Sequence, residues 1–225
     1  MERKLVWDLP VRLFHWSLVL LVLASWLTAE LGRLELHFYS GYAIATLVLF
    51  RLAWGIFGPR YARFGSFVAG PTRVYRELRG WLQGKPEPGA GHTAPGGWMI
   101  LLLLALLAAQ VATGLVNSHD GLDTGPWYWA APGEVRALGE TWHARLFDGL
   151  LVLSGVHVAA VLLYRLRPGI DLIGPMITGR KATAGPAIPG SRLPLAVALL
   201  LAAAGAVWLL VSSAPPPSLA DLGIY

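Results

Sequence analysis

The run WHARLFDGLLVLSGVHVAAVLLY, residues 142–164, decides the fold class. A helix of about 20 mostly apolar residues is long enough to cross a bilayer, and the charges of this run stand only near its beginning. It also carries His143 and His157, although an ionisable side chain inside a membrane is costly and usually functional. At about 100° per residue, the step from 143 to 157 falls about 40° short of whole turns, so both imidazoles face nearly the same way, about 21 Å apart along the axis.

Four more apolar runs make the chain a multi-pass membrane protein. Besides 144–164, the expected spans are residues 11–29, 38–57, 97–117 and 194–212. The composition agrees, because 14% of the residues are charged, against about 25% in a soluble domain. The chain has no cysteine, which excludes disulfides, iron–sulfur clusters and covalently attached haem.

The spans suggest a simple domain order. We expect an all-α integral membrane protein with a four-helix transmembrane bundle in residues 1–181 and a linker in residues 182–193. An additional transmembrane helix at 194–212 and a tail at 213–225 complete it. Residues 71–85 carry apolar side chains at helical spacing among arginines, which fits either a short amphipathic helix on the membrane surface or a polar loop with chance periodicity.

Basic residues predict the orientation. Of the 18 Lys and Arg residues, 13 lie before the first span, between the second and third, or between the fourth and fifth, and Arg12 and Arg51, near the same ends of their spans, bring the number on this side to 15. Because cytoplasmic loops are enriched in Lys and Arg, the N-terminus is expected inside and the C-terminus outside. This topology, together with anionic membrane lipid, accounts for the net charge of +5 without a nucleic-acid partner.

Four histidines fall at matching depths in the predicted spans. His15 and His157 lie toward the cytoplasmic side, and His37 and His143 lie at outer ends of their spans. Any one of them could be an interfacial or hydrogen-bonded histidine, but two facing pairs in a helix bundle are what two bis-histidine haems need. Zinc or copper would require three or four ligands at one depth.

Glycines near these histidines support the same interpretation. Gly41 follows His37 by one helical turn, Gly114 lies in the third span, and Gly155 precedes His157 by two residues. A glycine lets a flat ring approach the helix backbone, and close packing of two helices is the competing explanation for each.

Other polar residues have two interpretations. Arg12, Arg51 and Arg145 are each placed to pair with a haem propionate or to extend to lipid phosphate. His92 and His119 fall in the connections between spans, and we expect both to be solvated loop residues.

A motif at the start of the first span carries a family resemblance. The motif is Leu9-Pro10-Val11-Arg12-Leu13-Phe14-His15-Trp16. It resembles the first span of bacterial di-haem membrane cytochromes b, which include the cytochrome b561 type and the b-type cytochrome subunits of nickel–iron hydrogenases. Further matches are His37 with Gly41, Phe50–Trp54, Gly58–Tyr61, Gly91-His92, Thr113-Gly114, Trp142-His143, Gly155–Val158 and Met176–Gly179.

The resemblance covers roughly residues 5–181, with two departures. This chain has Gly91-His92-Thr93-Ala94-Pro95 where the family often has Gly-His-Asn-Pro, and residues 194–212 add a fifth span to the family's four. The first departure puts a role for that loop in doubt, and the second leaves the purpose of the extra helix open.

The resemblance implies a function for the paired histidines. His15, His37, His143 and His157 would hold two non-covalent b haems in the bacterial inner membrane. Electrons would pass between a periplasmic partner, such as a hydrogenase, a molybdenum enzyme or a cytochrome c, and the quinone pool. Two alternatives stay open: an enzyme that oxidises superoxide and reduces quinone, and a haem-free membrane anchor. An electron-carrier subunit is favoured over a stand-alone oxidoreductase.

Overall fold

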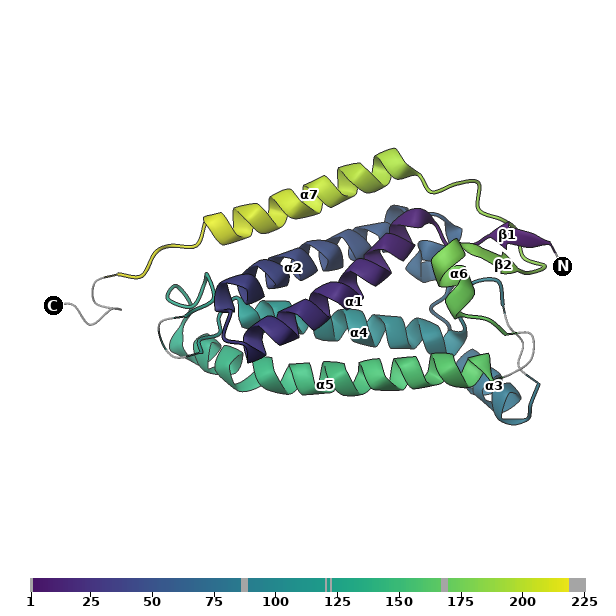
Figure 1. The fold of residues 1–225 in the computed structure, drawn as a ribbon, viewed down its shortest axis with the longest axis horizontal. Coiled ribbons are helices and arrows are strands. Elements are labelled where there is room, and N and C mark those ends of the chain that lie inside the picture. Colours follow the sequence, from purple (N-terminus) through teal and green to yellow (C-terminus); the bar gives the residue numbers. More distant parts are fainter. Residues whose placement is uncertain (1, 86–88, 120, 122, 167–169, 219–225) are drawn as a thin grey trace. The chain divides into compact units, whose positions relative to one another are not determined.

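The computed structural model describes residues 2–85, 89–119, 121, 123–166 and 170–218. Within these residues, five helices are long and apolar enough to cross a membrane (Figure 1). They are α1 (Leu9–Glu30), α2 (Leu34–Phe57), α4 (Ala94–Gly114), α5 (Gly133–Arg165) and α7 (Leu193–Ser212). The all-α fold class and the five spans expected from the sequence are therefore confirmed.

Large apolar side chains cover the outside of these helices. Leu20, Val152 and Trp208 are 66%, 67% and 68% exposed. A water-soluble protein rarely leaves so much apolar surface uncovered, whereas the hydrocarbon of a bilayer suits it.

Helix α5 is longer than the apolar pattern predicts. It begins at Gly133 rather than near residue 144. Its first turns carry Glu134, Arg136 and Glu140, and these charges hide the helix from a search for apolar runs. Charged side chains are stable in a helix that extends beyond the hydrocarbon into water.

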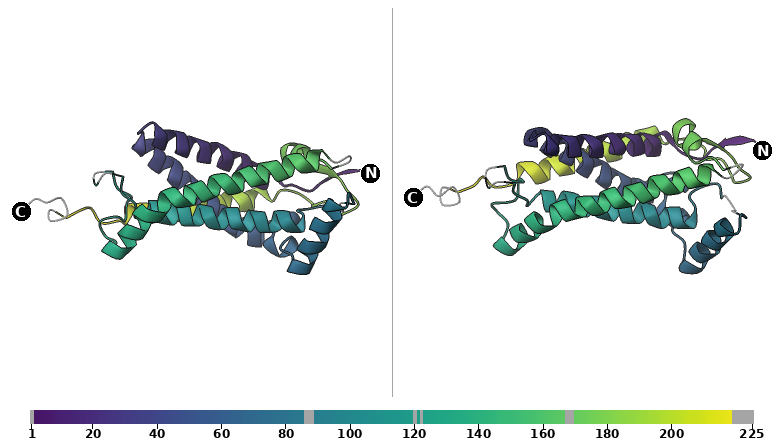
Figure 2. Two further views of the ribbon diagram at one scale, coloured as in Figure 1. Left: turned by 90° about the horizontal axis from the view of Figure 1, so that it is seen from below. Right: turned by 60° about the horizontal axis from the view of Figure 1, so that its bottom comes forward.

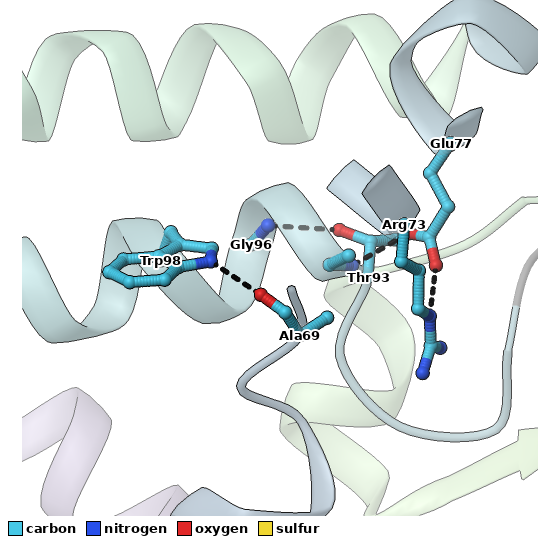
Figure 3. A network of polar contacts seen from close by, with 7 residues as sticks. Ala69, Arg73, Glu77, Thr93, Gly96 and Trp98 are labelled. Carbon is cyan, nitrogen blue, oxygen red and sulfur yellow. Dashed lines mark hydrogen bonds and ion pairs between the residues drawn. The ribbon is translucent and has the colours of Figure 1, made fainter. Parts of the chain in front are cut away.

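The amphipathic segment after the second span is a helix, α3 (Pro71–Leu82), so the loop alternative is wrong. Figure 2 shows α3 beside the beginning of α4. Glu77 joins the two, because its carboxylate accepts from the Ala94 backbone nitrogen at 2.6 Å and from Arg73 at 2.9 Å (Figure 3). Thr93 Oγ1 accepts from the Gly96 nitrogen, so the first turn of α4 is capped from both sides.

Two short strands tie the N-terminus to the chain after α5. Strand β1 (Arg3–Leu5) pairs antiparallel with β2 (Arg180–Ala182), which follows helix α6 (Ile173–Thr178) (Figure 1). Gly179 connects α6 to β2 in the left-handed conformation, with φ of 79°, and its carbonyl accepts from the backbone nitrogens of Val6 and Trp7. No local pattern in either segment predicts these strands.

The expected linker, residues 182–193, runs beside this sheet. The Ile188 nitrogen donates to the Leu5 carbonyl at 2.9 Å, and the Leu9 nitrogen donates to Ser191 Oγ at 3.0 Å. The described connections also contain two 3₁₀ turns, η1 (Arg60–Ala62) and η2 (Phe64–Ser66). Of the expected tail, residues 213–225, positions 219–225 lie outside the described residues.

The chain divides into two compact units. Unit 1 contains residues 1–17, 50–104 and 152–199, and unit 2 contains residues 18–49, 105–151 and 200–225. Each of the five long helices gives one part to each unit. Consequently His15 and His157 belong to unit 1, and His37 and His143 belong to unit 2.

Unit 1 has a well-packed polar centre at the start of α1. Asp8 is 1% exposed, and its Oδ1 accepts from the Val11 nitrogen at 2.8 Å and from Trp54 Nε1 at 3.1 Å. Trp54 itself is fully buried. Burial raises the pKa of the Asp8 carboxyl above its ordinary value, so this carboxylate depends on its two donors to remain ionised.

Candidate functional site

The four histidines predicted as ligands form two facing pairs. In unit 2, His37 of α2 and His143 of α5 have ring centres 6.1 Å apart and planes 87° apart. In unit 1, His15 of α1 and His157 of α5 have ring centres 6.5 Å apart and planes 54° apart. The pairing is the one expected from the sequence.

The spacing within each pair fits a metal ion between two imidazoles. A metal–nitrogen bond is about 2 Å long and the ring centre lies about 1 Å further, which puts the two ring centres roughly 6 Å apart. Among the described residues, no group of three or more His, Cys, Asp or Glu side chains is arranged to hold a metal ion. The donor set therefore suits an iron whose other ligands come from a porphyrin.

Hydrogen bonds orient the His37 ring. Its Nδ1 lies 2.9 Å from the carbonyl oxygen of Ser25, in the part of α1 that belongs to unit 2. A carbonyl oxygen only accepts, so Nδ1 carries the proton and Nε2 keeps its lone pair. Histidines that bind metals are commonly held this way.

The His143 ring is held by α4. Its Nδ1 lies 3.1 Å from Thr113 Oγ1, and the Thr113 hydroxyl donates to carbonyls of its own helix, Ala109 among them. The hydroxyl oxygen thus accepts from Nδ1, which again leaves the lone pair on Nε2. Gln110 Nε2 lies 3.3 Å from that nitrogen, so a metal at His143 takes the place of this amide.

A cavity of about 270 Å³ opens beside the pair of unit 2. His37 and His143 line it, together with Gly41 and Gly114. A methyl group built on Gly41 would meet no atom within 4 Å, so this glycine leaves open space. One built on Gly114 would lie 2.9 Å from His143 Cε1, so Gly114 makes room for the imidazole itself. Both predicted glycines border the cavity, and their roles differ.

The charged residues that line this cavity are acidic. They are Glu30 and Asp123, and the described lining contains no Lys or Arg. His119 also reaches the cavity and is exposed, as expected of a loop residue. The cavity thus presents negative charge to an approaching molecule.

The pair of unit 1 is surrounded by buried donors without partners. His15 Nδ1 and Arg12 Nε are buried and have no hydrogen-bond partner in the described part of the chain. Arg12 also donates through Nη1 to the Ile177 carbonyl. Gly155 is exposed, a methyl built on it would meet no atom within 4 Å, and it faces away from His157, because two residues turn a helix by about 200°.

Arg51 is 3% exposed, with its guanidinium carbon 4.9 Å from the centre of the Phe64 ring. A side chain so buried cannot extend to lipid phosphate, so that alternative is wrong for Arg51. Arg145 remains exposed and stacks over Trp142 at 5.7 Å, which suits the membrane surface.

His92 is the polar residue that sequence reasoning placed wrongly. Its ring lies 4.3 Å from the Trp7 ring and 4.5 Å from the Phe67 ring, and its Nδ1 is buried without a partner among the described residues. Burial, together with the nearby charges of Arg51 and Lys181, lowers the pKa of His92 to about 3. One feature of the sequence could have indicated a role in the interior: His92 belongs to the Gly91-His92 match with the cytochrome family.

An all-α membrane protein with facing imidazole pairs between its helices has the architecture of a membrane cytochrome b. Comparison with protein families agrees: the family described as prokaryotic cytochrome b561 matches residues 6–179. The chain belongs to this family, whose members are b-type cytochromes of electron transport.

Similar proteins carry a consistent name. Three are named probable Ni/Fe-hydrogenase B-type cytochrome subunit. The relative from Cupriavidus necator is 23% identical, with 77% of this chain and 85% of the relative covered. The relative from Rhizobium leguminosarum bv. viciae is 23% identical, with 78% and 87% covered, and the one from Azotobacter chroococcum is 24% identical, with 77% and 86% covered. No solved structure matches the chain.

Proposed function

We propose that this cytochrome carries electrons across the bacterial inner membrane through two b haems. His15 and His157 hold one haem, and His37 and His143 hold the other. The observation that carries the proposal is the ring spacing of 6.5 and 6.1 Å, which suits an iron between each pair. The cavity beside Gly41 supports a flat ring at the second pair.

The protein's own residues set the properties of each site. When bound, the haem iron supplies the one-electron chemistry. Each haem would be held by two imidazoles, so we expect electron transfer rather than oxygen binding. The proton on Nδ1 of His37 and of His143 is held by an oxygen acceptor, which fixes the tautomer and makes Nε2 a better donor to iron.

Orientation and the relatives' names indicate the partners at the two ends of the electron path. With 15 of 18 basic residues on one side, the N-terminus is cytoplasmic and the C-terminus is periplasmic. The relatives' names include a hydrogenase, so a periplasmic hydrogenase is the proposed electron donor, and membrane quinone is the proposed acceptor.

The names of the relatives favour an electron-carrier subunit over the superoxide alternative. In a haem-free anchor, the cavity and the unpaired buried nitrogens of unit 1 would have no ligand. The electron-carrier role accounts for both features.

Four single substitutions test the ligand assignment. His37→Ala and His143→Ala should remove one haem component, and His15→Ala and His157→Ala should remove the other. Haem stoichiometry and low-temperature absorbance of the purified variants measure this, with Tyr75→Ala, at an exposed position of α3, as the control. Loss of the same haem component in His15→Ala and His143→Ala would contradict the pairing. Unchanged haem content in all four variants would refute the proposal.

A further inference from the structure

Unit 1 contains buried side-chain nitrogens that have no hydrogen-bond partner in the described chain. Besides Arg12 Nε and His15 Nδ1, these are Arg51 Nη1 and His92 Nδ1. A buried donor without a partner costs about 1–3 kcal/mol, and more when it is charged. Native proteins rarely tolerate such groups, so several in one unit point to a ligand that accepts hydrogen bonds.

Arg51 is the most demanding of them. It is 3% exposed, and the face of Phe64 covers its guanidinium. This cation–π contact offsets only part of the free energy that burying the guanidinium charge costs. The one ion pair within the described residues joins Arg73 to Glu77, so Arg51 has no carboxylate in salt-bridge contact there.

Asp8 is the buried carboxylate whose charge acts on Arg51, and it is already engaged. Its Oδ1 accepts from Val11 and Trp54, and Asp8 and Arg51 influence each other only through space. The arginine therefore still needs an anionic oxygen at Nη1.

His92 points to the same kind of ligand. Trp7 and Phe67 fix its ring on two sides. The positive charges of Arg51 and Lys181 act on it, which favours an anionic ligand beside the ring. A neutral imidazole can still donate through Nδ1–H.

These residues lie in the same unit as the His15–His157 pair. Phe64 contacts the Arg51 guanidinium and lies 5.8 Å from Phe67, which contacts His92. One aromatic pair thus links Arg51 and His92, and both residues belong to the same compact unit as His15 and His157.

We propose that Arg51 and His92 bind a propionate carboxylate of the haem held by His15 and His157. Arg51 Nη1 supplies the charged hydrogen bond, and His92 Nδ1–H supplies a neutral one. The proposal rests on the haem function proposed above. Both donors are buried, so the carboxylate has to enter from the haem site rather than from the lipid headgroups.

The test measures the infrared bands of the haem propionate carboxylates in the haem-loaded, full-length protein. Redox-induced infrared difference spectra, with haem carrying isotope-labelled propionates, identify the carboxylate bands. The variants are His92→Leu, which removes the donor, His92→Asn, which restores an N–H donor, and Arg51→Gln. Arg79→Gln removes an exposed arginine of α3 and is the control. All are measured in vesicles of phosphatidylcholine alone and with phosphatidylglycerol.

The expected result is a shift of the labelled bands in His92→Leu and Arg51→Gln, with the wild-type position largely restored in His92→Asn and kept in the control. Arg51→Gln should also lower the midpoint potential of the same haem, because a positive charge near iron favours the reduced form. Should Arg51→Gln not fold, the two His92 variants still decide.

Unmoved bands in His92→Leu would overturn the inference. A shift that appears only with phosphatidylglycerol would assign the donors to a lipid phosphate instead. Failure of the proposed function is separate, because it would appear as unchanged haem content in His15→Ala and His157→Ala.

Discussion

Replacing Gly41 with alanine should have opposite effects on the haem-free and haem-loaded protein. Glycine inside a helix costs about 1 kcal/mol relative to alanine, and an added methyl at Gly41 meets no atom within 4 Å. Gly41→Ala should therefore stabilise the haem-free protein by up to about 1 kcal/mol. That methyl projects into the cavity beside His37 and His143.

With haem bound, the same methyl takes space that the proposal assigns to the porphyrin. Overpacking a filled site costs about 1–3 kcal/mol, which is roughly a 5- to 150-fold loss of affinity. The variant should thus bind the haem of unit 2 more weakly, while the component that depends on His15 and His157 is unchanged. Unfolding in detergent, without and with haem, and haem titration of the apoprotein measure the two effects.

Two other glycines serve as controls. Gly155→Ala adds a methyl to exposed, open surface of α5, so it should give the helix gain without a haem penalty. Gly114→Ala pushes on the His143 ring, with 2.9 Å between the new carbon and Cε1, so it should destabilise both forms. If Gly41→Ala retained haem as well as Gly155→Ala, the porphyrin would not lie against residue 41.

Three further predictions concern charge, orientation and ring geometry. Arg12→Gln should lower the midpoint potential of the haem at His15, since a nearby cation that favours the reduced form is lost; an unchanged potential in redox titration would favour the lipid-phosphate role. Reporters fused after Ser118 and Tyr225 should be periplasmic and one after Gly84 cytoplasmic, and cytoplasmic activity at Tyr225 would mean that α7 does not cross. Electron paramagnetic resonance of the oxidised protein should resolve two low-spin signals, because the paired ring planes differ by 87° in unit 2 and 54° in unit 1; one shared signal would contradict these angles.

The spans and histidine pairs were predictable because both depend on local periodicity. Apolar runs such as 194–212 reveal themselves by composition alone. The face shared by His143 and His157 follows from the helix repeat, and topology supplies the partners. Glu134 and Arg136 interrupt the apolar pattern, so a search for apolar runs does not detect the beginning of α5.

The β1–β2 pair was not predictable from local pattern. Each strand has three residues and many basic side chains, and Lys4 lies opposite Lys181. Nothing in either segment indicates a strand, because the pairing joins regions far apart in the sequence. The turn at Gly179 and its carbonyl, which accepts from Val6 and Trp7, hold the two together.

Burial of His92 and Arg51 shows why a residue's position along a membrane chain does not determine its surroundings. The segment around His92 is rich in glycine and proline, so its composition predicts a solvated loop. Trp7 and Phe67 nevertheless enclose the ring from distant parts of the chain. Arg51 lies near a helix end, where a long cation commonly extends to phosphate, yet Phe64 covers it. In both cases aromatic residues from other segments turn a group that would otherwise face water or lipid into a donor facing the protein interior. Such a donor is stable only if an acceptor reaches it, and for that reason these two residues, rather than the exposed Arg145, are the ones we assign to the haem carboxylate.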